Sequence, residues 1–263
     1  MIDKNKVSPF TTNINNIAVE RDFYRVNALK DPIFWEDFYA REMEPKISDV
    51  FKRLISLCTL SKPNVHILDK KIKTELSFII SSLLLRTKLA REQYFEIGEE
   101  TSNNVLADIM NNFQDLLNEE NRIYLRDFDY STELHKELFL KIINDETRLE
   151  RFSQILCQHY WICYKNINYK TEPIMTSDHP VLFKNVATGE HGLKNNGLGR
   201  LETAIFFPIN SEIILGIYPP YKILNKLKNY DGRLVIIDES TFFQKLNELQ
   251  IKQSYRQAYV RSE

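Results

Sequence analysis

The chain has 263 residues, 43% of them hydrophobic, which is enough for one large domain or two small ones around a substantial core. Its 35 Lys and Arg residues nearly balance 36 Asp and Glu residues, so the net charge of -1 excludes a global attraction to nucleic acid or to anionic lipid. No apolar run reaches the roughly 18 residues of a membrane span, and none of the seven glycines belongs to a GxGxxG or GxxxxGK nucleotide-binding loop.

Cysteine usage and the first residues of the chain indicate a cytoplasmic protein. Cys58, Cys157 and Cys163 lie in apolar surroundings without CxxC spacing, which favours buried free thiols over a disulfide or a zinc site. The starting sequence MIDKNKVSPF lacks the apolar stretch of a signal peptide. We therefore expect a cytoplasmic location and no membrane partner.

Residues 1–30 are expected to form an N-terminal arm laid over the core. The first 20 residues are polar and rich in Asn and Thr, and their apolar residues follow neither helical nor strand spacing. The end of the arm, residues 18–26, has the composition of a short docking strand.

Residues 31–158 are predicted to be mainly helical. Asp31 followed by Pro32 is typical of a helix start, and Pro45 should kink or restart this helix because proline lacks a backbone donor. Apolar residues at helical spacing and the capping residues between them predict further helices over residues 47–58, 69–100, 101–116 and 131–156.

Residues 159–239 are predicted to be rich in β-strands. Short β-prone runs separated by turn residues predict strands at 161–164, 172–175, 203–207, 212–218 and 234–237, with a surface loop over 185–199. A closing helix, capped by Ser240, is expected within residues 240–263 and should run to about Tyr259. The sequence thus predicts an α+β protein in which a mainly helical N-terminal two-thirds precedes an antiparallel sheet and a C-terminal helix.

Two charged residues interrupt apolar helix faces. Glu44 shares a face with Ile47 and Phe51, and Arg86 follows Leu83 on its own helix. A buried charge needs a partner, so one interpretation is a structural Glu44–Arg86 pair between two helices. The other joins both residues to Asp178 in one polar pocket.

The polar segment Thr176-Ser177-Asp178-His179-Pro180, here named the TSDHP segment, ends a predicted strand, where functional residues often lie. Ser and Asp before Pro commonly cap turns, which would make the segment structural. Its chemistry, if present, would use Asp178 as a carboxylate, and Ser177 as a nucleophile with His179 as base. No GxSxG elbow accompanies these residues, and the other four histidines are scattered.

The order of these features resembles DUF4238, a family known only as a domain of unknown function. The resemblance covers nearly the whole chain and rests on INNIAVERDFY, on Glu44 before an apolar helix, and on FIISSLLLRTKLAR, EPIMTSDHPV, FFPINSEIILGIYP and the final RQAYVRS. It implies an α+β protein of bacterial genomes, an accessory or effector protein in some phage-defence or mobile-element settings. Asp178 matches the aspartate of the family's SDxP motif, His179 stands where Asn is more usual, and the N-terminal HYxPxFxLxxF segment of the family is missing.

Two functions from different classes follow as hypotheses. The first is a hydrolase acting on nucleic acid, in which Glu44, Arg86 and Asp178 surround one pocket. Its carboxylates could hold Mg²⁺, and Arg86 would bind a phosphate group. Ser177 and His179 are further catalytic candidates. The alternative is a non-catalytic module that binds or regulates a protein partner, in which the same polar cluster is structural. An open cleft lined by Glu44, Arg86 and Asp178 favours the enzyme, and a sealed, mutually satisfied cluster favours the binding module.

Overall fold

The structure is a computed structural model, and it describes residues 1–5, 9–11, 23–27, 29–113, 117–126, 132–192 and 196–260. Half of the expected N-terminal arm, residues 6–8, 12–22 and 28, therefore lies outside the described residues. The docking strand expected at residues 18–26 falls partly there, and residues 23–26 are not in a strand.

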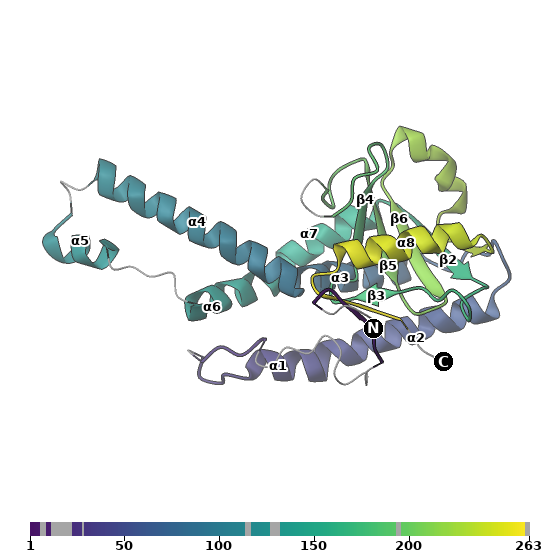
Figure 1. Ribbon diagram of the computed structural model, residues 1–263, viewed down its shortest axis with the longest axis horizontal. Helices are drawn as coiled ribbons and strands as arrows, with labels where there is room; N and C mark the ends of the chain where they lie inside the picture. The colour runs from purple at the N-terminus through teal and green to yellow at the C-terminus, as the bar shows by residue number, and fades with distance from the viewer. Residues whose placement is uncertain are drawn as a thin grey trace.

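The helical part begins with one long helical stretch, which consists of α1, η2 and α2 in succession (Figure 1). Pro45 lies in the first turn of α2, directly after η2, and proline has no N–H to donate to the preceding turn. The hydrogen-bond pattern changes there from π to α, but the backbone stays helical from Phe34 to Leu60, so the predicted restart does not occur. The helices are α1 (Phe34–Phe38), the π-helix η2 (Tyr39–Met43), α2 (Glu44–Leu60), α3 (Lys70–Leu85), α4 (Lys88–Asn112), α5 (Glu119–Arg126), α6 (Thr132–Ile143), α7 (Glu146–Cys157), the 3-10 helix η4 (Lys222–Tyr230) and α8 (Ser240–Gln253).

The helix predicted over residues 69–100 is wrong in its length. It breaks after Arg86, because the Thr87 hydroxyl accepts the Ala90 N–H at 3.2 Å and caps a new helix, α4. The break predicted at 101–104 does not occur, and α4 continues through these residues to Asn112. Ser and Asn are therefore tolerated in the middle of α4, whose described residues are all at least partly exposed.

The helix predicted over residues 131–156 is likewise divided in two. The Asp145 carboxylate accepts the Arg148 N–H at 3.2 Å and starts α7, while Asn144 accepts the Tyr39 hydroxyl at 2.6 Å. The predicted cap Ser131 lies outside the described residues. Helices α4, α5 and α6 extend away from the sheet, with α5 at the far end (Figure 1).

The main sheet has five strands in the order β4-β5-β6-β2-β7. All neighbours are antiparallel except β2 and β7, which are parallel. The predicted α+β class is confirmed, and the predicted antiparallel sheet holds except at this edge. The strands are β2 (Tyr160–Asn166), β4 (Leu182–Asn185), β5 (Thr203–Pro208), β6 (Ile213–Tyr218) and β7 (Leu234–Ile237).

A second, three-stranded sheet joins distant parts of the chain. Its order is β1-β8-β3, formed by Ile2–Asp3, Gln257–Tyr259 and Thr176–Ser177. The strand predicted at 172–175 is wrong, because Pro173 cannot donate to a ladder and pairing starts only at Thr176. The closing helix also ends earlier than predicted, at Gln253, and the chain returns as β8.

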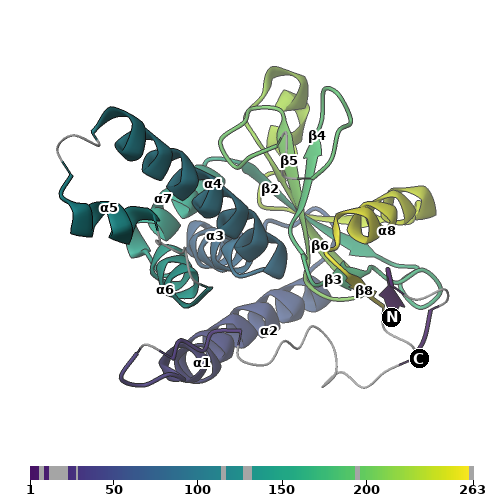
Figure 2. The same ribbon diagram turned by 60° about the vertical axis from the view of Figure 1, so that its left-hand side comes forward.

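Alternating side chains place the main sheet between two helical layers (Figure 2). On β2, Trp161 and Cys163 pack with α2, α3 and α7, whereas Ile162 and Tyr164 pack with α8. The period of two therefore buries both faces of the central strands. Among the described helices, none has the length and apolarity to cross a membrane.

The two ends of the chain meet at β1 and β8. The buried Asp3 carboxylate accepts Arg256 Nε at 3.1 Å and Gln257 Nε2 at 2.8 Å. These hydrogen bonds, the Gln257 side chain foremost, lower the pKa of Asp3 to about 2. The start of the arm is thus fixed beside the segment that follows α8.

Candidate functional site

Asp178 holds the turn between α8 and β8. One carboxylate oxygen accepts the Tyr255 N–H at 2.9 Å, and the other accepts the N–H groups of Arg256 and Gln257 at 2.8 Å each. The Asp178 N–H donates in return to the Gln257 carbonyl at 3.1 Å. Both carboxylate oxygens are therefore engaged by backbone.

The environment of Asp178 agrees only in part with the sequence prediction. The sequence predicts a largely buried carboxylate whose donors are the backbone amides of the turn that follows it, with Ser177 or an arginine such as Arg86. The side chain is half-buried, and its donors are backbone N–H groups that follow α8. Burial raises the pKa of Asp178, and the three backbone N–H groups oppose this effect.

Ser177 and His179 are brought close together without forming a nucleophile–base pair. The Ser177 hydroxyl accepts the backbone N–H of His179 at 3.1 Å and also accepts Gln250 Nε2. The His179 imidazole instead lies beside Thr87, with Nδ1 3.2 Å from Oγ1. The hydroxyl of Ser177 thus contacts the backbone of His179, while the ring turns towards the start of α4.

Burial lowers the pKa of His179 to about 4, so this imidazole is neutral at pH 7. It lines a cavity of about 260 Å³ together with His191 and Lys252, beside the C-terminal end of α8. Within the part of the chain that the structure describes, the His179 ring forms no hydrogen bond with His191 or Lys252.

Several residues that complete this cluster were not predicted. Gln253 pairs with the Phe183 backbone through both ends of its amide, at 3.0 and 2.8 Å, and the Tyr255 hydroxyl donates to Glu92 at 2.7 Å. Gln250 and Gln253 lie on the buried face of α8 with Leu246. Polar residues at apolar positions of this helix could therefore have indicated that they bind buried partners. Nothing local in the sequence pointed to Thr87 or Tyr255.

Glu44 and Arg86 line one cavity of about 490 Å³, which Asp178 does not line. The Arg86 Nε donates to the Tyr24 hydroxyl at 2.9 Å, and the guanidinium carbon lies 3.7 Å from the Tyr39 ring centroid. Glu44 is exposed and forms no ion pair within 4 Å of Arg86. The direct contact that one interpretation required is absent between these two described residues, because tyrosines surround the guanidinium.

Tyr24 is nevertheless an electrostatic neighbour of both charges. Burial raises the pKa of Tyr24, Arg86 opposes this shift, and Glu44 adds to it. Tyr24 is therefore a hydrogen-bond partner of Arg86, whereas Glu44 acts on it only through its charge.

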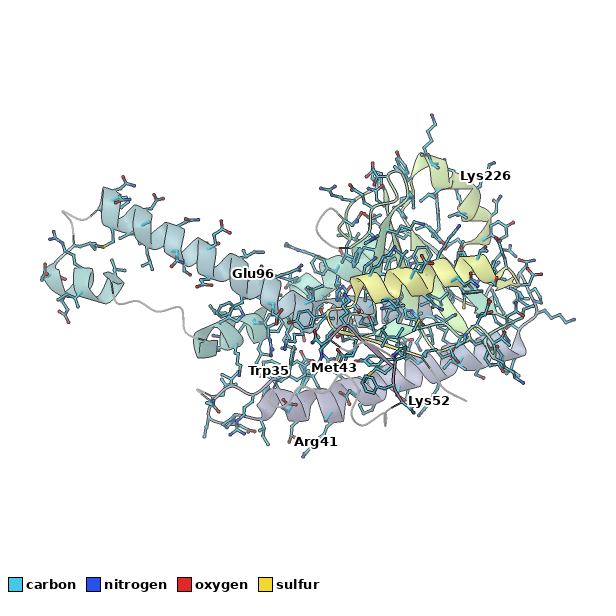
Figure 3. The ribbon with its side chains drawn as sticks, in the orientation of Figure 1. Trp35, Arg41, Met43, Lys52, Glu96 and Lys226 are labelled. Atoms are coloured by element: carbon cyan, nitrogen blue, oxygen red, sulfur yellow. The ribbon has the colours of Figure 1, made fainter. Side chains whose placement is uncertain are left out.

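A hollow larger than the two cavities above is a groove between α2 and α7 with α3 as its floor, here named the three-helix groove. Its volume is about 1220 Å³, and the end near α1 is aromatic. Figure 3 shows Trp35, which lines the groove, and Arg41, which does not, on opposite sides of the α1–η2 segment. Its apolar lining residues are Phe34, Trp35, Phe38, Tyr39, Met43, Ile47, Val50, Phe78, Ile79 and Leu149.

No group of three His, Cys, Asp or Glu side chains able to hold a metal ion occurs in the described part of the chain. The carboxylates of Glu44 and Asp178 line different places, so they do not converge on one ion there. The Mg²⁺ expected from the sequence remains a prediction, as do the catalytic roles of Asp178, Glu44, Arg86, Ser177 and His179.

Comparison with known proteins identifies a family. The family model DUF4238, described as a protein of unknown function, matches residues 1–263. No significant match was found among curated proteins or among solved structures.

Asp178→Asn separates a structural from a catalytic role. We expect the substitution to lower the free energy of unfolding by about 1 to 3 kcal/mol, because a charged acceptor of three N–H groups becomes a neutral amide with a single acceptor oxygen. Urea unfolding measures the change, with Glu248→Gln on the exposed side of α8 as control. Unchanged stability would show that the carboxylate does not hold this turn.

His179→Asn tests the buried neutral imidazole. The unfolded histidine gains a proton near pH 6.5, but the folded one gains it only near pH 4, so wild-type stability falls as pH decreases through this window. We expect the difference between wild type and variant to change by about 3 kcal/mol between pH 7 and pH 4. Chemical denaturation at several pH values measures it, with the exposed His191→Asn as control. A pH-independent difference would contradict the burial of this ring.

Proposed function

The chain belongs to the DUF4238 family of proteins of unknown function, and we propose that it is a non-catalytic module that binds a helical segment of a partner protein in the three-helix groove. The observation that carries this proposal is the groove itself, which combines apolar walls, an aromatic end and an acidic edge. The TSDHP segment supports it, because the Asp178 and Ser177 oxygens are engaged in holding the turn and α8.

The groove is built from one face of each of three helices. Lining residues follow helical spacing on α2 at 46, 47, 49, 50 and 53, on α3 at 74, 75, 78, 79 and 82, and on α7 at 146, 149, 150, 153 and 154. The 16 residues of α3 extend about 24 Å along its floor. A further amphipathic helix lying there would pack against three helices, as in a helix bundle.

The charges of the groove favour a basic partner. Arg53 pairs with Glu75 at 2.7 Å, and Lys46 pairs with Glu42 at 3.5 Å. No Lys or Arg of the described residues lies within ion-pair distance of the remaining acids of the groove, which are Asp49, Glu146 and Glu150. A helix with Lys or Arg beside its apolar face would therefore complement the α7 edge.

We place this module in the bacterial cytoplasm, as an accessory or effector protein in a phage-defence or mobile-element setting. The sulfur atoms of Cys58 and Cys163 are 3.3 Å apart as free thiols, an arrangement that a reducing compartment preserves. The genomic setting follows from the family resemblance.

A synthetic peptide tests the groove. We expect an amphipathic peptide of about 16 leucine and lysine residues, matched to α3 in length, to bind more tightly than the same peptide with glutamate in place of lysine. Trp35 lines the groove and Trp161 is fully buried, so a change in fluorescence on titration reports on Trp35.

Charge reversal locates that binding. Glu146→Lys combined with Glu150→Lys should weaken the lysine peptide about tenfold, since two edge attractions become repulsions. Glu99→Lys with Glu100→Lys, exposed on α4, is the matched control and should bind as wild type does. Equal affinity for both peptides, or equal weakening in the control, would overturn the proposed groove function.

Nucleic-acid-directed hydrolysis is a second candidate, favoured by one observation. Glu44, Lys52 and Arg86 line the same cavity, so a carboxylate and two cations lie near one another there. If this candidate is correct, Glu44→Gln and Arg86→Met abolish Mg²⁺-dependent cleavage of single-stranded DNA or RNA, whereas Glu99→Gln does not. Absence of cleavage by the wild-type chain with Mg²⁺ or Mn²⁺ on DNA and RNA would eliminate it.

A further inference from the structure

Arg86 has a fixed guanidinium group at the end of α3. Its Nε donates to the Tyr24 hydroxyl at 2.9 Å, and its guanidinium carbon lies 3.7 Å from the Tyr39 ring centroid and 5.3 Å from that of Tyr24. A cation that lies over one aromatic ring and donates to the hydroxyl of a second is held in one orientation. The group is therefore positioned before any ligand arrives.

One end of this guanidinium group lacks an acceptor. The Arg86 Nη1 is buried and has no hydrogen-bond partner within the part of the chain that the structure describes. Leaving a buried charged donor unpaired is unfavourable, and a carboxylate is the acceptor whose geometry matches a guanidinium fork. Because Nη1 itself is closed to solvent, a ligand carboxylate would approach the guanidinium from the edge with which Arg86 lines the adjacent cavity.

The cavity beside Arg86 has the size and walls of a small-molecule site. Its volume of about 490 Å³ lies within the usual range for ligand pockets. The walls are apolar, with polar groups contributed by Ser48, Lys52 and Glu44; the apolar residues are Ile47, Phe51, Ile55 and Leu83. An occupant should therefore have an apolar body and one polar end.

The charged side chains that line the cavity favour a ligand with one negative charge. Lys52 and Arg86 contribute two positive charges and Glu44 one negative charge, so the lining has room for one further negative charge. We infer that this cavity binds a small organic monocarboxylate, with the carboxylate on Arg86 and the apolar body against α2. A phosphate dianion fits less well because Glu44 would repel its second charge.

This site is independent of the proposed groove function. The cavity is lined by Glu44, Ser48 and Lys52 on one face of α2. The groove is lined by Lys46, Val50 and Arg53 on the neighbouring face, and Ile47 borders both. Either site can therefore be disproved while the other remains.

Calorimetric titration of the full chain with hexanoate, 1-hexanol and inorganic phosphate tests the inference. We expect hexanoate to bind at least tenfold more tightly than 1-hexanol, which has the same chain length without the charge, and than phosphate. Arg86→Met should remove the preference for hexanoate over hexanol. Equal binding of hexanoate and hexanol by the wild type, or binding of neither, would overturn the inference, and tighter binding of phosphate would replace the carboxylate by a phosphate site.

Glu44→Gln provides a second variant at an exposed position, where folding should not be disturbed. Removing the negative charge should strengthen hexanoate binding several-fold, whereas Glu42→Gln, which is exposed two residues earlier, should not. Weaker or unchanged hexanoate binding by Glu44→Gln would contradict the inference that Glu44 repels a bound carboxylate. This test does not depend on whether Arg86→Met folds.

Discussion

The Asp178 carboxylate is the interaction on which the arrangement of the C-terminal region depends. It binds three successive N–H groups after α8, so the chain turns there and continues as β8. Strand β8 then pairs with β1 on one side and with β3, which contains Ser177, on the other. The carboxylate thus joins the TSDHP segment, the end of α8 and the start of the chain.

The neighbouring polar groups extend this connection into the helical part. Gln250 donates to the Ser177 hydroxyl and to the His179 carbonyl, and the His179 ring lies against Thr87, the capping residue of α4. The residues that most suggested catalysis in the sequence therefore link the small sheet, α8 and α4. The two hollows beside α2, which combine apolar and charged side chains, are the places where we propose that ligands bind.

The parts of the fold that depend on local pattern could be predicted, and those that depend on distant contacts could not. Short β-prone apolar runs located β5, β6 and β7 closely; every residue of β5 and β6 is buried, whereas β7 is a partly exposed edge strand. The division at Arg86 and Thr87 has no proline or glycine to mark it. Likewise, the donors of Asp178 lie 77 to 79 residues away in the chain, so a local turn was the natural but incorrect source. Periodicity correctly singled out Arg86, but it could not show that Tyr24 and Tyr39, rather than Glu44, would surround it.

Hydrogen exchange of the amides of Tyr255, Arg256 and Gln257 in the native wild-type protein tests the central claim most directly, because these three N–H groups are the ones that Asp178 accepts. If the carboxylate fixes this turn, all three amides exchange far more slowly than those of an unstructured peptide, and their protection is lost together in Asp178→Asn. Exchange at the rate of an unstructured peptide in the wild type would contradict a structural role for Asp178 and would return the TSDHP segment to the candidates for catalysis.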